Sequence, residues 1–264
     1  MFSASFRLLM YLVGLGYGVL GAALFLAPDW ASGHFAWKVS PLVAATIGGW
    51  CLGNAYLAFV TARRAQWSVV YASVSYLALF GLFEAWVVWS FRPRLIMSNP
   101  LTWLYLGTLA ANVAMAAYGV IDFVRQPKSS VRATIPMTPI WRVYAVAFIA
   151  LVGFLGLYGI MTQTGGQSRS IFPEPLSPFN LRSFGAFYLA LALSVTPLIF
   201  TRRLNPVLHH GFASYGLIVI ITIAGLRYLH LFDFVQRPLG LLYFGAYVAV
   251  GAVVLFVLLK RGTG

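Results

Sequence analysis

Hydrophobic residues in this chain gather into long runs, and the short segments between them hold most of the charged residues and prolines. Each run is about 20 residues long, which is the length that a helix needs to cross a bilayer core. Inside lipid, only a helix or a closed barrel satisfies every backbone hydrogen-bonding group. The pattern therefore predicts an all-α integral membrane protein with eight transmembrane helices. They are expected at residues 8–26, 42–60, 69–89, 101–120, 143–160, 184–200, 212–232 and 239–259.

Composition supports the same class of protein. Of 264 residues, 61% are hydrophobic and 9% are charged, whereas ordinary globular chains carry about a quarter charged residues. This excludes a soluble domain and a disordered chain. The single cysteine, Cys51, lies in a hydrophobic run and excludes both an intrachain disulfide and a cysteine metal cluster.

The positive charges indicate the orientation of the chain. The N-terminus, the even-numbered connections and the C-terminus hold Arg7, Arg63, Arg64, Arg125, Lys128, Arg132, Arg142, Arg202, Arg203, Lys260 and Arg261. The odd-numbered connections hold only Lys38, Arg92, Arg94, Arg169, Arg182 and Arg237. Because Lys and Arg concentrate in cytoplasmic loops, both termini are expected in the cytoplasm, with a bacterial inner membrane as the expected location.

The net charge of +13 also raises the question of a nucleic-acid partner. The basic pairs flank predicted helices and lack the interleaved aromatic residues of an RNA-binding surface. We therefore expect the lipid bilayer, with its anionic inner leaflet, as the partner of these charges and no nucleic acid.

The two halves of the chain resemble each other at an offset of 137 or 138 residues. Residues 39–52 align with residues 176–189, and residues 100–107 align with residues 238–245, with matched proline, glycine and tyrosine positions. Each half contains four predicted helices, so the second copy starts on the same side of the membrane as the first. The sequence predicts two parallel four-helix repeats, at residues 1–124 and 141–264, joined by a cytoplasmic linker at residues 125–140.

Two charged residues fall inside predicted helices, Glu84 and Arg227. Such residues are costly in lipid and are candidates for function by default. His230, Asp233 and Arg237 follow Arg227 at spacings of three, three and four, so on a continuous helix they share one face. We predict a ligand-binding site of Glu84, Arg227, His230 and Asp233 for an anionic headgroup, a proton or a small polar ligand. A structural ion pair between Glu84 and Arg227 is the alternative interpretation.

Small and polar residues inside the predicted helices indicate close packing. Gly14, Gly18 and Gly21 share helical spacing, as do Gly49 and Gly53. Such small residues let membrane helices approach closely. Two further residues, Asn54 and Asn112, are expected to form hydrogen bonds between helices.

The chain carries no motif for nucleotide binding, zinc binding or a nucleophilic serine, and it has only five acidic residues. No catalytic residue and no metal ligand is predicted, the cofactor is unknown, and enzymatic activity is not expected. The four histidines are poorly placed to hold a haem between facing helices. The expected function is binding or transport of a small or lipid-like molecule at the repeat interface. The alternative is a non-catalytic subunit or scaffold with a membrane-protein partner.

Overall fold

The computed structural model describes residues 1–126, 135–162, 171, 174–235 and 238–262, and in these ranges it forms helices and no strand. Seven of the helices are long and apolar enough to cross a membrane. The prediction of an all-α polytopic membrane protein is confirmed at this level. These seven segments are α1 (Ala4–Leu26), α3 (Pro41–Arg64), α4 (Trp67–Ser90), α5 (Pro100–Arg125), α6 (Pro139–Met161), α7 (Pro178–Val195), which continues through the 3₁₀ turn η3 (Thr196–Phe200), and α8 (Asn205–Arg227).

Shorter elements and one further long helix complete the described chain. Helix α2 (Pro28–His34) and the 3₁₀ turn η1 (Arg92–Arg94) follow α1 and α4. The 3₁₀ turn η4 (Leu229–Leu231) follows α8, and α9 (Leu239–Gly262) ends the described chain.

Serine–proline pairs begin two of the helices. The Ser40 hydroxyl accepts a hydrogen bond from Val43 N at 3.2 Å, and the Ser177 hydroxyl accepts one from Asn180 N at the same distance. The prolines that follow these serines occupy the first helical position, where the missing N–H costs nothing. These pairs therefore fix the starts of α3 and α7.

Helix α8 departs most from the sequence prediction. A span was expected at residues 212–232, whereas α8 runs from Asn205 to Arg227. The two histidines near its start, His209 and His210, made this segment look like a connection. His210 is instead buried, and its ring is within hydrogen-bonding distance of the hydroxyls of Ser73 and Ser214.

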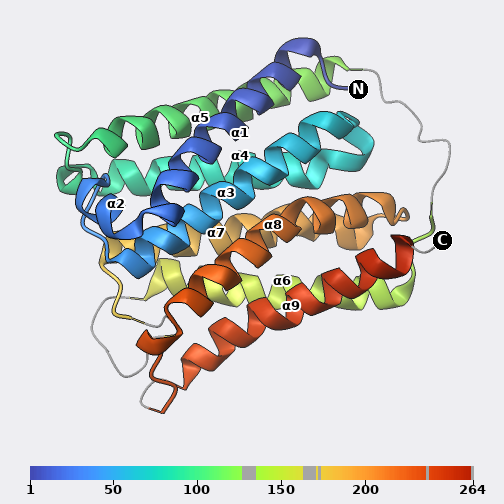
Figure 1. Cartoon of the computed structure of the whole chain (residues 1–264). Helices are drawn as coiled ribbons and strands as arrows, with labels where there is room; N and C mark the ends of the chain where they lie inside the picture. Colours follow the sequence, from blue (N-terminus) through green and yellow to red (C-terminus); the bar gives the residue numbers. More distant parts are fainter. Residues whose placement is uncertain (127–134, 163–170, 172–173, 236–237, 263–264) are drawn as a thin grey trace.

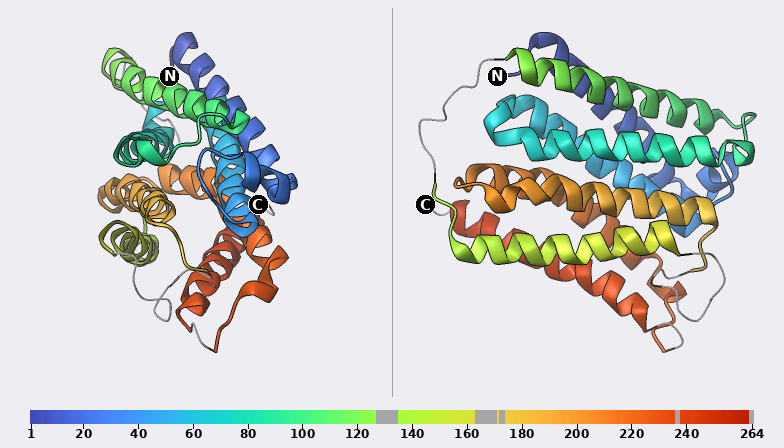
Figure 2. Two further views of the ribbon diagram at one scale, coloured as in Figure 1. Left: turned by 90° about the vertical axis from the view of Figure 1, so that its left-hand side faces the viewer. Right: turned by 180° about the vertical axis from the view of Figure 1, so that it is seen from behind.

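The long helices form two layers of four (Figures 1 and 2). One layer has the order α1, α3, α8, α9, and the other has the order α5, α4, α7, α6, with neighbours in contact within each layer. Contacts of α3 with α8 and of α4 with α7 join residues 4–125 to residues 139–262, while α1 with α5 and α4 with α8 join the layers. Both ends of the chain lie at the same end of the bundle (Figure 1).

Glycines create the closest helix contacts, as expected. A Cβ atom on Gly21 of α1 would lie 2.7 Å from Leu52 N of α3. A Cβ atom on Gly53 of α3 would lie 2.6 Å from Leu217 Cα of α8. The first contact fixes α1 against α3, and the second fixes the junction between the halves.

Candidate functional site

Glu84 lies in the interior, where the two halves of the chain meet. Its Oε1 atom accepts hydrogen bonds from the Tyr105 hydroxyl of α5 at 2.6 Å and from the Ser183 hydroxyl of α7 at 2.9 Å. Only 4% of the Glu84 surface is exposed, and its Oε2 atom is buried with no hydrogen-bond partner among the described residues. This carboxyl group thus links three helices and keeps one oxygen unused.

A small internal cavity of about 20 Å³ adjoins Glu84. Trp50 also lines the cavity, and its indole Nε1 atom is likewise buried without a partner in the described chain. Tyr17, Trp37, Cys51, Tyr105 and Ser183 also contribute to the lining. The cavity therefore has room for a single water-sized molecule and offers it at least one donor and one acceptor.

The two asparagines form hydrogen bonds between helices nearby, as predicted. Asn54 accepts a hydrogen bond from the Tyr76 hydroxyl at 2.7 Å. Asn112 donates to the Tyr17 hydroxyl at 2.7 Å and to the Leu77 carbonyl oxygen at 3.1 Å. These bonds hold α1, α3, α4 and α5 together, and one of the bonded residues, Tyr17, lines the Glu84 cavity.

The other three candidates lie at the exposed end of α8. Arg227 donates from Nη1 to the Phe25 carbonyl oxygen at 3.2 Å and lies over the Tyr228 ring. His230 is exposed on η4, and Asp233 is exposed with its Oδ1 atom accepting from Val235 N. Within the described residues, Glu84 and Arg227 form no ion pair.

The expected polar stripe on one helical face is wrong. Helix α8 ends at Arg227, and the chain continues through η4, with Phe232 extended. The spacing of three and four residues orders side chains on a face only while the helix lasts. Arg237 lies outside the described residues.

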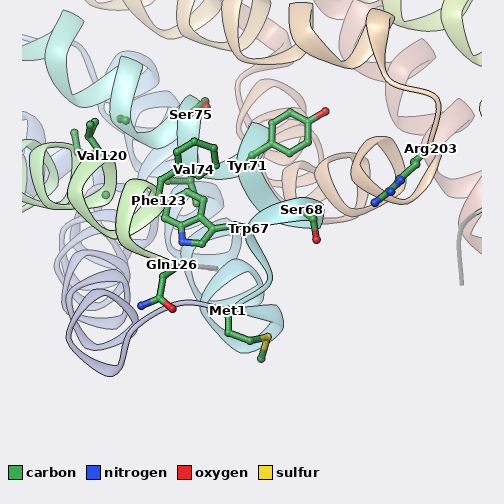
Figure 3. Close-up of a pocket in the computed structure, with 13 residues that line it drawn as sticks. Met1, Trp67, Ser68, Tyr71, Val74, Ser75, Val120, Phe123, Gln126 and Arg203 are labelled. Carbon is green, nitrogen blue, oxygen red and sulfur yellow. The ribbon is translucent and has the colours of Figure 1, made fainter. Parts of the chain in front are cut away.

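A larger feature lies at the end of the bundle that carries both termini: an open groove of about 650 Å³ between α4 and α5 (Figure 3). Most of its lining is apolar or aromatic, and its polar groups other than Ser75 lie toward the helix ends. The lining residues are Met1, Trp67, Ser68, Tyr71, Val74, Ser75, Ala78, Ala116, Gly119, Val120, Phe123, Gln126 and Arg203.

Asp122 holds the aromatic wall of this groove in place. Its carboxylate accepts from the Trp67 indole Nε1 at 2.9 Å and from Ser3 N at 3.2 Å. Trp67 also stacks on Phe6, with ring centroids 5.2 Å apart. Because Asp122 is buried, these bonds fix the N-terminal segment, α4 and α5 to one another at the groove.

Arg203 reaches the groove from the other half of the chain. Figure 3 shows it extending from the connection between α7 and α8 toward the side where Ser68 and Tyr71 lie. Backbone hydrogen bonds on both sides of it, from Met137 N to Arg202 O at 3.0 Å and from Leu204 N to Ile135 O at 2.8 Å, hold this connection against the segment that precedes α6. The exposed guanidinium is thus carried on a fixed backbone.

Sequence reasoning found Glu84 but missed the groove. In the sequence Arg203 indicates only the topology, and no pattern marks Asp122. Small residues three positions apart do occur on both helices, Ser75 and Ala78 on α4 and Ala116 and Gly119 on α5, yet this pattern is typical of close helix packing as well as of a groove. Which of the two forms depends on how far apart α4 and α5 lie, and that distance is set by their tertiary contacts.

Comparisons with known proteins give no family for this chain. No family model, no curated protein and no solved structure matches it.

Proposed function

We propose that this polytopic membrane protein binds a phospholipid in the groove between α4 and α5. The observation that carries the proposal is the groove itself, which has a volume of about 650 Å³, mostly apolar walls and an arginine at its polar end. Ligand sites of this size commonly have mostly apolar walls and a few polar groups that orient the ligand.

The length of the groove matches one leaflet. On α4 its lining runs from Trp67 to Ala78, which at 1.5 Å of rise per residue corresponds to roughly 17 Å. This is about half of the ~30 Å hydrocarbon thickness. An acyl chain that enters from the helix ends would therefore reach the middle of the bilayer.

The polar end suits an anionic headgroup. Arg203 is exposed, and Gln126 lies on the same rim. Ser68 also lines this end, and its buried hydroxyl has no hydrogen-bond partner within the described part of the chain. Arg pairs well with phosphate because its guanidinium presents several donors in one plane.

The same proposal includes the two parallel four-helix repeats and the linker between them. A two-fold axis along the membrane normal would exchange α1 with α6, α3 with α7, α4 with α8 and α5 with α9. That exchange turns the layer α1, α3, α8, α9 into the layer α6, α7, α4, α5, which is the second observed layer in reverse order. The helix order therefore supports two parallel repeats.

Contacts between aligned residues give independent support. Trp50 and Phe187, 137 positions apart, stack with ring centroids 4.5 Å apart and an interplanar angle of 7°. Ser73 and His210, also 137 positions apart, have side-chain atoms 3.2 Å apart. Equivalent residues touch each other only beside a symmetry axis, so both pairs are expected if an approximate two-fold axis passes between them.

The groove opens at the end of the bundle that we propose to be cytoplasmic. Both chain ends lie there, together with Arg7, Arg63, Arg64, Arg125, Arg142, Arg202 and Arg203. The opposite end carries Lys38, Arg92, Arg94, Arg182 and Arg227. This distribution supports an inner leaflet with anionic lipid at the groove, and the bacterial inner membrane stays a prediction.

The test compares two neighbouring arginines. Arg203→Ala removes the guanidinium at the groove, whereas Arg202→Ala removes an adjacent exposed charge that does not line it. A basic residue near an anionic surface contributes about 1 kcal/mol. We therefore expect Arg203→Ala to weaken binding of a phosphatidylglycerol about fivefold, as measured by lipid titration and native mass spectrometry.

Phosphatidylcholine serves as the zwitterionic comparison in the same titration. If Arg202→Ala and Arg203→Ala weaken phosphatidylglycerol binding equally, the loss comes from the general surface charge and not from a contact in the groove. Unchanged binding in Arg203→Ala would contradict the headgroup contact.

The proposed lipid groove leaves three predictions from the sequence open. Ligand contacts of Arg227, His230 and Asp233, transport of the bound molecule, and the alternative role as a subunit with a membrane-protein partner stay predictions. Copurification of a stoichiometric second protein from native membrane would favour the subunit role.

A further inference from the structure

A second site lies in the interior and is independent of the lipid groove. Two buried polar atoms without partners, Glu84 Oε2 and Trp50 Nε1, belong to residues that line the same cavity. A buried polar group without a partner is destabilising, and native proteins commonly satisfy such groups with an ordered water. Two such atoms beside one cavity therefore indicate a polar ligand there.

The size of the cavity limits the ligand to one small molecule. At about 20 Å³ it exceeds the roughly 10 to 15 Å³ that one water requires, and it is far too small for a metabolite. The indole Nε1–H of Trp50 can only donate. The ligand must therefore accept from Trp50 and also form a hydrogen bond with Glu84, and a water molecule can do both.

None of the described residues that line the cavity beside Glu84 carries a positive charge. The other titratable side chains that line the cavity are Tyr17 from α1, Cys51 from α3 and Tyr105 from α5. An isolated carboxylate is very costly in a dry interior, and such a group usually takes up a proton instead. Its Oε1 atom already accepts from Tyr105 and Ser183, so the proton belongs on the free oxygen, Oε2.

We propose that the cavity holds one water molecule and that Glu84 is a protonated carboxylic acid whose Oε2–H donates to this water. The water also accepts from Trp50 Nε1–H. Glu84 is thereby a proton-binding site at the junction of the two halves, with Ser183 of α7 as its contact across that junction.

The aligned positions in the other half carry no such site. Glu84 aligns with Ile221 at the offset of 137 residues and with Thr222 at the offset of 138 residues, and neither is an acid; Ser183 aligns with Thr46. Each threonine hydroxyl donates to a carbonyl oxygen of its own helix, at 2.7 Å to Ile218 O and at 2.9 Å to Leu42 O. The proton site is therefore a feature of one half of the chain.

Infrared spectroscopy tests the proposal directly, because the chain has only two glutamates, Glu84 and Glu174. A protonated carboxylic acid has a carbonyl stretch separate from that of a carboxylate. We expect this band at neutral pH in the wild-type protein, with a shift on labelling with [¹³C]glutamate and another on transfer to D₂O. The labelling needs no variant, so it is informative even if a substitution at Glu84 prevents folding.

Three variants complete the design. Glu84→Gln should abolish the band, and Glu174→Gln should leave it unchanged. Trp50→Phe should shift it, because the water loses one of its two fixed partners, whereas Trp103→Phe, at an exposed tryptophan, should not. Absence of a ¹³C-sensitive acid band at neutral pH would overturn the protonated state, and an unshifted band in folded Trp50→Phe would overturn the bridging water.

Discussion

Asp122 is the residue on which the groove wall depends most. Replacing it with alanine leaves Trp67 Nε1–H and Ser3 N–H without their acceptor. Hydrogen bonds to charged groups contribute about 1.5 to 3 kcal/mol. We expect Asp122→Ala to lower the free energy of unfolding by about 2 kcal/mol, as measured by denaturant titration in detergent. Asp29→Ala, at an exposed carboxylate, is the matched control and should change the free energy of unfolding by far less.

At the residue scale, the sequence predicts positions better than partners. A glutamate inside a transmembrane helix is costly in lipid and is therefore a candidate for function, so Glu84 could be found without a structure. Its partners could not, because Tyr105 and Ser183 come from helices whose contacts follow from tertiary packing. For Arg227 the partner predicted from the sequence is wrong. The topology predicts that it lies near Glu84, whereas its guanidinium donates to the Phe25 carbonyl oxygen.

Helices α3 and α8 approach closely at Gly53, so adding one methyl group there tests this contact. In Gly53→Ala the new Cβ atom would meet the Leu217 backbone at 2.6 Å, so the helices must move apart. Overpacking of this kind costs about 1 to 3 kcal/mol, and we expect that loss in the free energy of unfolding.

Gly107→Ala on α5 is the control for Gly53→Ala. Nothing lies within 4 Å of the position that its Cβ atom would occupy. Alanine is also the better helix former, so this variant should be neutral or slightly stabilising. Equal destabilisation in both variants would show that backbone propensity, and not contact with Leu217, governs the result.

For the helices as elements, the sequence predicts their number of residues and their order better than it predicts where each helix begins and ends. Hydropathy identified each long helix because the bilayer requires about 20 apolar residues. The start of α8 was misplaced because His210 is polar in sequence but buried against Ser73 and Ser214 in the fold. Its end was misplaced because the apolar residues after Arg227 continue into η4 instead of the helix.

For the whole molecule, the junction of the two halves can be tested by cross-linking. In a Cys51→Ala background, the pair Ser73→Cys and His210→Cys replaces side chains whose Oγ and Nδ1 atoms are 3.2 Å apart. Because both positions are buried, we expect iodine, a small membrane-permeant oxidant, to join this pair as a disulfide in membranes. The pair Ser73→Cys and Gly211→Cys should react much more slowly, since residues 210 and 211 point in different directions on α8. Equal rates would contradict the contact between α4 and α8.

The central claim is that a lipid binds between α4 and α5. Its most direct test is a substitution that fills the groove with a bulky side chain. Ala78→Phe places a ring among its lining residues, whereas Ala117→Phe places the same ring on the exposed face of α5 outside the groove. Native mass spectrometry of both proteins, extracted gently from the same membrane, reports the retained lipid. The account predicts a loss of bound phospholipid in Ala78→Phe of about 5-fold to 150-fold, because overlap with a ring costs about 1 to 3 kcal/mol, and no loss in Ala117→Phe. Equal lipid retention by the two folded variants would contradict it.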